Sequence, residues 1–408
     1  MNTDAIRFIS RLSAGAKRLH ELQDKARWSV FAVVFLLALL PVFLHVPLTG
    51  LATCFWSFIE VGTVLYLCGR PYRAAMYEKA LQEAGITDHN GNPPAFVCMD
   101  RNGSACIFTF YTAGIPPARW QEKRPAVESA LNIHAGVIES GKDQRNVVIR
   151  GTDGAFRFPD IISWNNGFIP LDESEIALGE GYGQKIDFDF DVYPHMLIGG
   201  ATGSGKSILL KCILHQAIQK GYRVIIADFK GGVDYGPEFR GNAEFIDNED
   251  TLIDSLENIV NEILPQRKAL WNQYEVKKLE EYNQRNQESP LPRILIACDE
   301  LGELLDTTGA SKEQKDKISR ITACLSTVAR QGRAFGINLV LATQRPDSNL
   351  VPGQIKSNIT YRICGRADDV LSRLILDNTS ASDLIPPNSK GLFLDSEGNA
   401  IKGYYFTD

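Results

Sequence analysis

The sequence predicts an α/β protein in three parts. A domain with a parallel central sheet over 181–408 follows a small α+β domain over 72–180 and an N-terminal two-helix transmembrane hairpin over 28–69. Three observations predict this arrangement. Apolar strand-like runs alternate with helical patterns after residue 181, which is typical of parallel sheets with crossover helices. One of these strands runs into a glycine-rich loop and a helix, and two long apolar runs lie near the N-terminus.

Length, charge and cysteine content limit the number of domains and the class of protein. A chain of 408 residues is long enough for two or three domains. Its net charge of −6 provides no whole-chain basic field for nucleic acid, although a ring can keep a basic lining inside an acidic exterior. The eight cysteines are scattered without metal-ligand spacing. They are typical of buried, reduced thiols in a cytosolic protein.

The N-terminal segment predicts a membrane anchor. Residues 1–27 are basic and amphipathic, and the run Trp28–Val46 carries no charged residue. A second apolar run, Leu51–Cys68, contains only Glu60. Each run approaches the roughly 20 residues that span a bilayer. Lys and Arg flank both outer ends, so we expect a two-span protein of the cell membrane with its N-terminus and later domains in the cytoplasm. A buried hairpin in a soluble core is disfavoured, because neither run has a polar face.

The small domain over 72–180 is predicted from mixed patterns. Helical patterns cover 72–84 and 117–131, and apolar alternation predicts strands at 95–98, 105–111, 135–139 and 146–150. We find no catalytic constellation in this domain.

The glycine-rich loop has the spacing of a P-loop. It consists of Gly200, Ala201, Thr202, Gly203, Ser204, Gly205, Lys206 and Ser207. Glycines let backbone N–H groups surround a phosphate, and the following helix N-terminus adds partial positive charge. We expect Lys206 to reach the β- and γ-phosphates of ATP and Ser207 to hold Mg²⁺.

Two later strand ends complete the predicted nucleotide site. The run Ile294–Cys298 ends in Asp299 and Glu300. We expect Asp299 to hold Mg²⁺ and Glu300 to polarise the attacking water. Gln344 ends another apolar strand, and ligands of open α/β sheets bind at such carboxyl ends. Gln344 is therefore a candidate γ-phosphate sensor; a plain polar strand cap is the alternative.

The order of these motifs resembles the FtsK/SpoIIIE family of hexameric, DNA-translocating motors with a RecA-like core. Besides Asp299-Glu300 and the run 194–198 into the P-loop, the resemblance rests on four stretches: 329–337, 339–346, 355–359 and 372–377. It covers roughly 181–408 and implies DNA as substrate, gripped through its phosphates, and a homo-hexamer. It also implies an arginine finger acting across the subunit interface. Arg333 and Arg330 are the candidates, with Arg362 and Arg373 behind them. Lys230 and the stretch 309–317 are weaker candidates for the pore lining.

A hairpin followed by a motor is similar to the conjugative coupling proteins of Gram-positive plasmids and integrative elements. This resemblance implies delivery of DNA with its relaxase, or relaxosome, to a type IV secretion channel. Three alternatives stay open: a chromosome or plasmid segregation pump, a nucleotide-switched docking protein for a relaxosome, and a secretion ATPase. The segregation pump ranks lower, because its expected orientation-reading module and long linker are not seen in this sequence.

Overall fold

The computed structural model describes residue 12, residue 56 and residues 58–59, 61–66, 74–112, 114–141, 143–229, 234–345 and 353–407. It divides into two compact units, Met1–Phe156 and Arg157–Asp408. No helix among the described residues is long and apolar enough to cross a membrane. Most of the hairpin predicted over 28–69 lies outside the described residues, so the hairpin stays a prediction.

The first unit is a small α+β domain, as predicted. Its four-stranded antiparallel sheet has the order β1-β2-β4-β3. The elements are α4 (Ala74–Glu83), β1 (Ala95–Asn102), β2 (Ala105–Tyr111), α5 (Pro117–Glu122), α6 (Arg124–Leu131), β3 (Ile133–Ser140) and β4 (Asn146–Asp153). The single helix expected over 117–131 is two helices, because Pro125 suits the first turn of a new helix and disrupts a helix interior. An aromatic core joins Phe108, Phe110 and Trp120.

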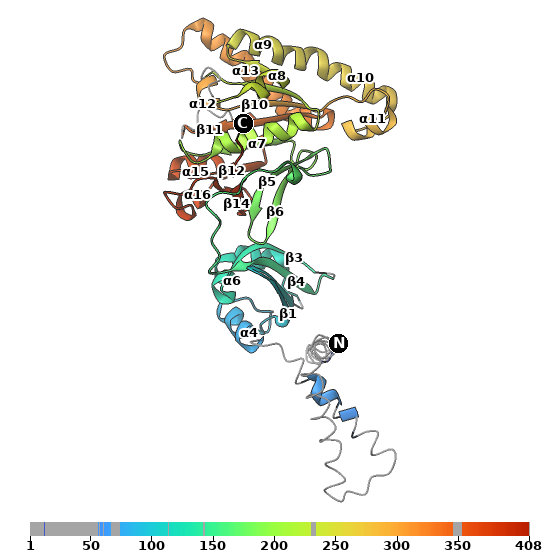
Figure 1. Cartoon of the computed structure of the whole chain (residues 1–408), viewed down its shortest axis with the longest axis vertical. Coiled ribbons are helices and arrows are strands. Elements are labelled where there is room, and N and C mark those ends of the chain that lie inside the picture. Colours follow the sequence, from blue (N-terminus) through green and yellow to red (C-terminus); the bar gives the residue numbers. More distant parts are fainter. Residues whose placement is uncertain are drawn as a thin grey trace, which may run out of the picture. The chain divides into compact units, whose positions relative to one another are not determined.

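The second unit is built on a ten-stranded sheet of order β6-β5-β14-β13-β12-β7-β11-β10-β8-β9 (Figure 1). Its strands are β5 (Glu175–Gly181), β6 (Gln184–Asp189), β7 (His195–Gly199), β8 (Arg223–Ala227), β9 (Glu244–Ile246), β10 (Ile294–Cys298), β11 (Ile337–Thr343), β12 (Tyr361–Cys364), β13 (Leu392–Asp395) and β14 (Ala400–Gly403). The stretch from β9 to β12 is parallel, as predicted.

Beyond the predicted parallel part, the rest of this sheet is antiparallel. Strands β13, β14, β5 and β6 pair antiparallel. The hairpin connections β5–β6 and β13–β14 are too short for the crossovers that parallel neighbours need. Because β5 belongs to this sheet, residues 157–180 group with the second unit. The two compact units therefore divide at 156/157, whereas the sequence places the domain boundary at 180/181.

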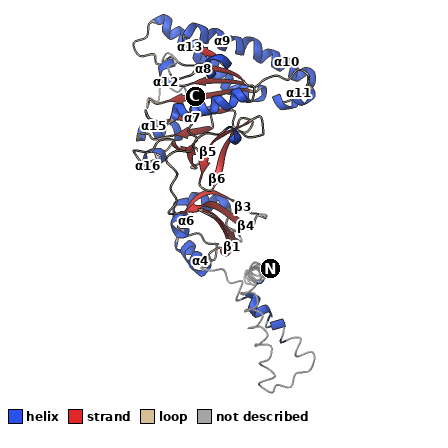
Figure 2. Ribbon diagram, viewed as in Figure 1, coloured by secondary structure: helices blue, strands red, loops and turns tan. Residues whose placement is uncertain are grey.

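Helices cover both faces of the parallel strands (Figure 2). They are α7 (Lys206–Gln219), α8 (Pro237–Asn242), α9 (Glu249–Asn258), α10 (Leu264–Tyr274), α11 (Leu279–Arg285), α12 (Leu301–Leu304), α13 (Lys312–Gln331), α14 (Gly353–Asn358), α15 (Asp369–Leu376) and α16 (Ser380–Leu384). A π-helical turn, Ile259–Ile263, joins α9 to α10. Pro265, which cannot donate to the carbonyl four residues earlier, explains this shift of the ladder.

Two hydrophobic cores fill the space on either side of the sheet. Along β10, Ile294, Ile296 and Cys298 join α9 and α13, whereas Leu295 and Ala297 face the core of α7. This period of two, with apolar residues on both faces, is what a doubly covered strand requires. The carboxyl ends of β7, β10 and β11 are thereby held at one edge of the sheet.

Candidate functional site: a nucleotide site at one edge of the sheet

The P-loop lies between β7 and α7, as predicted, and its backbone is held on a second side by the C-terminal strands. Gly205 has a φ of 102°, and a Cβ atom there would come 2.9 Å from the backbone nitrogen of Gly391. A Cβ atom on Gly200 would lie 2.5 Å from the Ser204 hydroxyl. Glycine is thus required at Gly205 by both conformation and close packing against backbone, whereas at Gly200 a Cβ atom would displace the Ser204 hydroxyl. The first backbone N–H groups of α7 face the loop.

Lys206 and Asp299 form a buried pair beneath the loop. Lys206 Nζ donates to Asp299 Oδ1 at 3.1 Å and to the Asp299 carbonyl oxygen at 2.6 Å. Both residues are almost completely buried, with 6% of Lys206 and 1% of Asp299 exposed. The Ser207 hydroxyl donates to Asp299 Oδ1 at 3.3 Å. A buried charge needs such a partner, so the pair keeps the Lys206 ammonium in place.

The hydroxyl and carboxylate at Ser207 and Asp299 fit Mg²⁺. At Mg–O distances of 2.0–2.1 Å, neighbouring octahedral ligands lie about 3 Å apart, close to the 3.3 Å seen here. Among the described residues there is no cluster of three or more His, Cys, Asp or Glu that could hold a metal. In the usual Mg²⁺ site, substrate phosphates and water supply the remaining ligands.

Glu300 and Gln344 lie together at the adjoining strand ends. Glu300 is 5% exposed, and its Oε1 accepts from the Thr343 hydroxyl at 2.9 Å and from the Gln344 backbone N–H at 3.2 Å. The Gln344 side chain in turn accepts from the Thr202 hydroxyl of the P-loop at 2.9 Å. One residue therefore joins the tip of the P-loop to the Glu300 carboxylate. A positioned carboxylate of this kind can orient a water molecule beside a bound phosphate.

His195 begins β7, at the end of the strand away from the P-loop. Its Nδ1 accepts from the Leu339 backbone N–H at 3.0 Å, and its Nε2 lies 3.1 Å from the Ala329 carbonyl oxygen. Nε2 therefore carries the proton. Burial lowers the pKa of His195 to about 4, because the low-dielectric core disfavours the imidazolium. The ring is a neutral structural link between β7, β11 and α13.

Sequence reasoning missed Arg366. Its guanidinium donates to the Thr202 carbonyl oxygen in the P-loop at 2.6 Å and to the Pro387 carbonyl oxygen at 2.7 Å. The Arg366 backbone carbonyl also accepts from the Ala201 N–H at 2.7 Å. Arg366 and Thr202 lie about 160 positions apart and share no motif. Only the place of Arg366 just after β12, beside β7, could have indicated the contact.

Asp228 also lies at the site, at the end of the strand next to β10. Ala227 and Cys298 are register partners, so Asp228 and Asp299 end adjacent strands. Asp228 is 3% exposed. Burial, and then the charges of Asp299 and Asp228, raise the pKa of Tyr235 well above its ordinary value. Lys230, which the sequence suggested for the pore, lies outside the described residues.

The structure does not bring Arg333 to the P-loop of its own chain. Arg333 precedes β11 and donates to the Asp191 carbonyl oxygen, just before β7, at 3.0 Å. Because β7 and β11 are parallel, this is the edge of the sheet opposite the P-loop. Arg362 is bound within its own chain, in an ion pair with Asp377. Any action of Arg333 on a nucleotide must therefore be on that of another subunit.

Comparison with known proteins agrees with this site. Residues 176–349 match the family model described as "Helicase HerA, central domain". The solved structure of the pCW3 conjugation coupling protein TcpA, in its monomer form with ATPγS, is 34% identical with a TM-score of 0.60. It covers 83% of this chain and 96% of that one. The chain belongs to the FtsK/SpoIIIE family. This FtsK/SpoIIIE protein is accordingly a P-loop ATPase.

Curated relatives of the FtsK/SpoIIIE protein are longer. The DNA translocase FtsK of Helicobacter pylori strain J99 is 31% identical over 241 residues, and that of Caldanaerobacter subterraneus is 33% identical over 224 residues. These alignments cover 53% and 52% of this chain but only 27% and 30% of the relatives. The chain thus spans less than a third of the curated relatives it matches. EssC of Geobacillus thermodenitrificans, at 16% identity and a TM-score of 0.52, shares the fold.

Proposed function

We propose that the chain is an ATP-driven DNA translocase, anchored in the cell membrane, that acts as a coupling protein in conjugative DNA transfer. The observation that carries this proposal is the 34% identity to a conjugation coupling protein over 96% of that protein's solved chain. The nucleotide-site residues Lys206, Asp299 and Glu300 support it chemically. A nucleotide-switched docking protein would not need Glu300 and Gln344 to be linked to the P-loop as they are.

Hydrolysis follows from the positions of the side chains. Lys206 leaves Asp299 for the β- and γ-phosphates as ATP enters, because a phosphate is a stronger partner for its ammonium. Ser207 and Asp299 would hold Mg²⁺, which supplies charge neutralisation on the phosphates. Thr343 and the Gln344 N–H hold the Glu300 carboxylate in position, and this carboxylate orients the attacking water. Because the Thr202 hydroxyl donates to the Gln344 side chain, a movement of the P-loop shifts Gln344 and with it Glu300.

A ring of subunits would complete the site. Arg333 lies at the sheet edge opposite the P-loop, so head-to-tail packing about a rotation axis would bring it toward a neighbour's nucleotide. An arginine supplied in this way stabilises the charge of the transition state. We propose a homo-hexamer on this basis, with DNA held in its pore by contacts to phosphates.

The apolar runs over 28–69 would attach this motor to the cytoplasmic face of the membrane. There it would receive DNA with a bound relaxase and pass both to a type IV secretion channel. Relaxosome proteins and the channel are the proposed partners.

A mating assay tests the proposal. Donor cells that lack the chain are supplied with wild type, Lys206→Ala or Lys211→Ala, and transfer of the conjugative element is counted. Lys211 lies one turn further along α7 and serves as the matched control. We expect transfer with wild type and Lys211→Ala and its loss with Lys206→Ala. Normal transfer with Lys206→Ala would contradict the proposal.

A further inference from the structure

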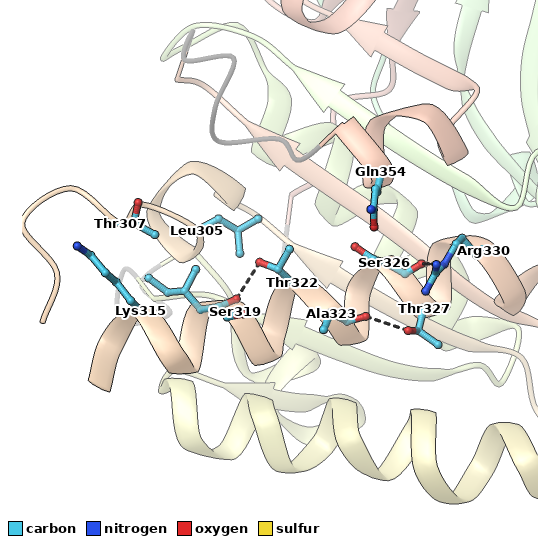
Figure 3. A pocket seen from close by; sticks show the side chains of 11 residues that line it. Leu305, Thr307, Lys315, Ser319, Thr322, Ala323, Ser326, Thr327, Arg330 and Gln354 are labelled. Atoms are coloured by element: carbon cyan, nitrogen blue, oxygen red, sulfur yellow. Dashed lines mark hydrogen bonds between the residues drawn. The ribbon is translucent and has the colours of Figure 1, made fainter. Parts of the chain in front are cut away.

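A groove lies along α13, on the side of the helix that faces the beginning of α14 (Figure 3). Its volume is about 520 Å³. Along the helix it is lined by a stripe with a spacing of three or four residues, which places its members on one face: Lys315, Ser319, Thr322, Ser326 and Arg330. Gln354 of α14 lines it from across, and Leu305 and Thr307 close one end. We call this feature the α13 groove.

The cations of the α13 groove differ from those on the other side of the same helix. Lys317 and Arg320 are paired with Asp250 and Glu257 of α9 at 2.7 Å. Lys315 and Arg330 are exposed, and neither forms a salt bridge with any described residue. None of the described residues that line the groove is acidic. Within a chain of net charge −6, the groove therefore holds uncompensated positive charge.

The hydroxyl groups between these cations can donate hydrogen bonds. Ser326 lines the groove, and its hydroxyl can donate to a ligand there. Thr322 and Thr327 donate to backbone carbonyl oxygens of their own helix at 2.8 and 2.9 Å, and rotation about χ1 would release them. Cations with hydroxyl and amide donors, and no carboxylate, fit an anion with several oxygens.

The shape of the groove indicates a chain of such anions. Lys315 and Arg330 are 15 positions apart, which is about 22 Å along a helix at 1.5 Å per residue. One small anion cannot contact both. A DNA strand, with a phosphate about every 3.4 Å of axial rise, presents several over this length. Phosphate contacts of this type come from Lys, Arg, Ser, Thr and Gln side chains and carry no base preference.

The groove is also close to the nucleotide site. Thr343 donates to Glu300 and accepts from the Arg345 backbone N–H at 3.3 Å. The Arg345 side chain is paired with Asp306 at 2.9 Å, and Asp306 lies between the groove residues Leu305 and Thr307. A short, continuous set of contacts therefore connects the groove to the Glu300 carboxylate.

We propose that the α13 groove binds the sugar–phosphate backbone of DNA. The inference rests on the proposed function, because it names a surface through which a DNA motor would hold its substrate. It assigns Lys315 and Arg330 to phosphates, with Ser319, Ser326 and Gln354 as neutral donors between them.

The test is the salt dependence of DNA binding by the full chain. Fluorescence anisotropy with a labelled 30-base-pair duplex, and with one of its single strands, gives the slope of log K against log salt. We compare wild type with Lys315→Ala/Arg330→Ala. The matched control is Lys317→Ala/Arg320→Ala, which removes the same charge from the opposite face of the same helix. Because all four side chains lie outside the hydrophobic core, we expect every variant to melt like wild type.

We expect the groove variant to bind duplex 10- to 100-fold more weakly at 0.1 M salt, with a slope smaller by about 2, since each lost phosphate contact removes about 0.9. The control should retain the wild-type slope. An unchanged slope in the groove variant, or an equal loss of DNA affinity in the control, would overturn the assignment of the groove. DNA binding by wild type would in that case leave the proposed function intact. Absence of DNA binding by wild type would overturn both.

Discussion

The Thr202 hydroxyl of the P-loop donates to the side-chain oxygen of Gln344 at the end of β11, at 2.9 Å. The Gln344 backbone N–H donates to Glu300 at 3.2 Å. A ligand that displaces Thr202 therefore acts directly on the residue that positions the catalytic carboxylate. Changes to Thr202, Gln344 or Glu300, or to the residues around them, should therefore alter ATP binding or hydrolysis.

Lys206→Ala should lower ATP hydrolysis by a factor of 100 or more, on the order of what one preorganised charge contributes to a transition state. The change also removes the partner of the buried Asp299 carboxylate. The measurement is phosphate release at saturating ATP, with Lys211→Ala as the control on the same helix. Hydrolysis within twofold of wild type would show that Lys206 does not contact the phosphates.

Glu300→Gln should abolish hydrolysis and leave nucleotide binding intact. The amide keeps the shape of the side chain and an acceptor for Thr343, but it cannot orient and deprotonate water. A loss of about 10²- to 10⁴-fold in kcat is expected for a general base. Glu303→Gln, an exposed neighbour on α12, is the control. A variant that neither binds nor hydrolyses ATP would point to a structural role for Glu300.

Arg366→Ala should weaken ATP binding about tenfold, since hydrogen bonds from a charged donor contribute about 1.5–3 kcal/mol. The side chain holds the Thr202 carbonyl and the Pro387 carbonyl together, so its loss loosens the P-loop. Titration with a fluorescent ATP analogue measures the effect. Arg366→Lys keeps the charge but cannot reach both carbonyls, and it should fall between wild type and alanine. Equal affinity in all three would remove Arg366 from the site.

His195 should make the second unit sensitive to acid. Its pKa is about 4 in the folded chain and about 6.5 when unfolded, so the unfolded state binds the proton more tightly. The stabilisation is complete above pH 6.5 and is lost as the pH falls toward 4. At about 1.4 kcal/mol per pKa unit, this amounts to about 2 kcal/mol between pH 7.5 and pH 5.

The measurement is urea unfolding at both pH values for wild type and His195→Gln. Glutamine does not titrate, so the variant should lose about 2 kcal/mol less than wild type on acidification. Parallel losses in the two proteins would mean that His195 is not the group responsible.

The parts that sequence predicted well are those encoded locally. The glycines of the P-loop, Lys206 and Ser207 all lie within eight residues. The apolar run of β10 directly precedes Asp299 and so indicates its place at a strand end. Helix α13 begins after Ser311, which forms a capping box with Gln314 three residues later. Each of these signals is complete within one element.

What sequence could not predict depends on pairing between distant segments. Strands β5 and β6 are short, and only their contact with β14 places them in the large sheet. Strand β14 ends at Gly403, and Tyr405 beyond it makes an isolated bridge to Ser163, a contact that no local pattern encodes. Arg366 reaches Thr202 for the same reason, since β12 and β7 are neighbours.

The central claim is that ATP hydrolysis at this site drives movement of DNA. The most direct measurement is the steady-state ATPase rate of the full chain with and without duplex or single-stranded DNA, with Glu300→Gln as the blank. The account predicts a rate that rises severalfold with at least one of the two DNA forms and vanishes in the variant. A rate that depends on Glu300 but is the same with and without either form of DNA would contradict it.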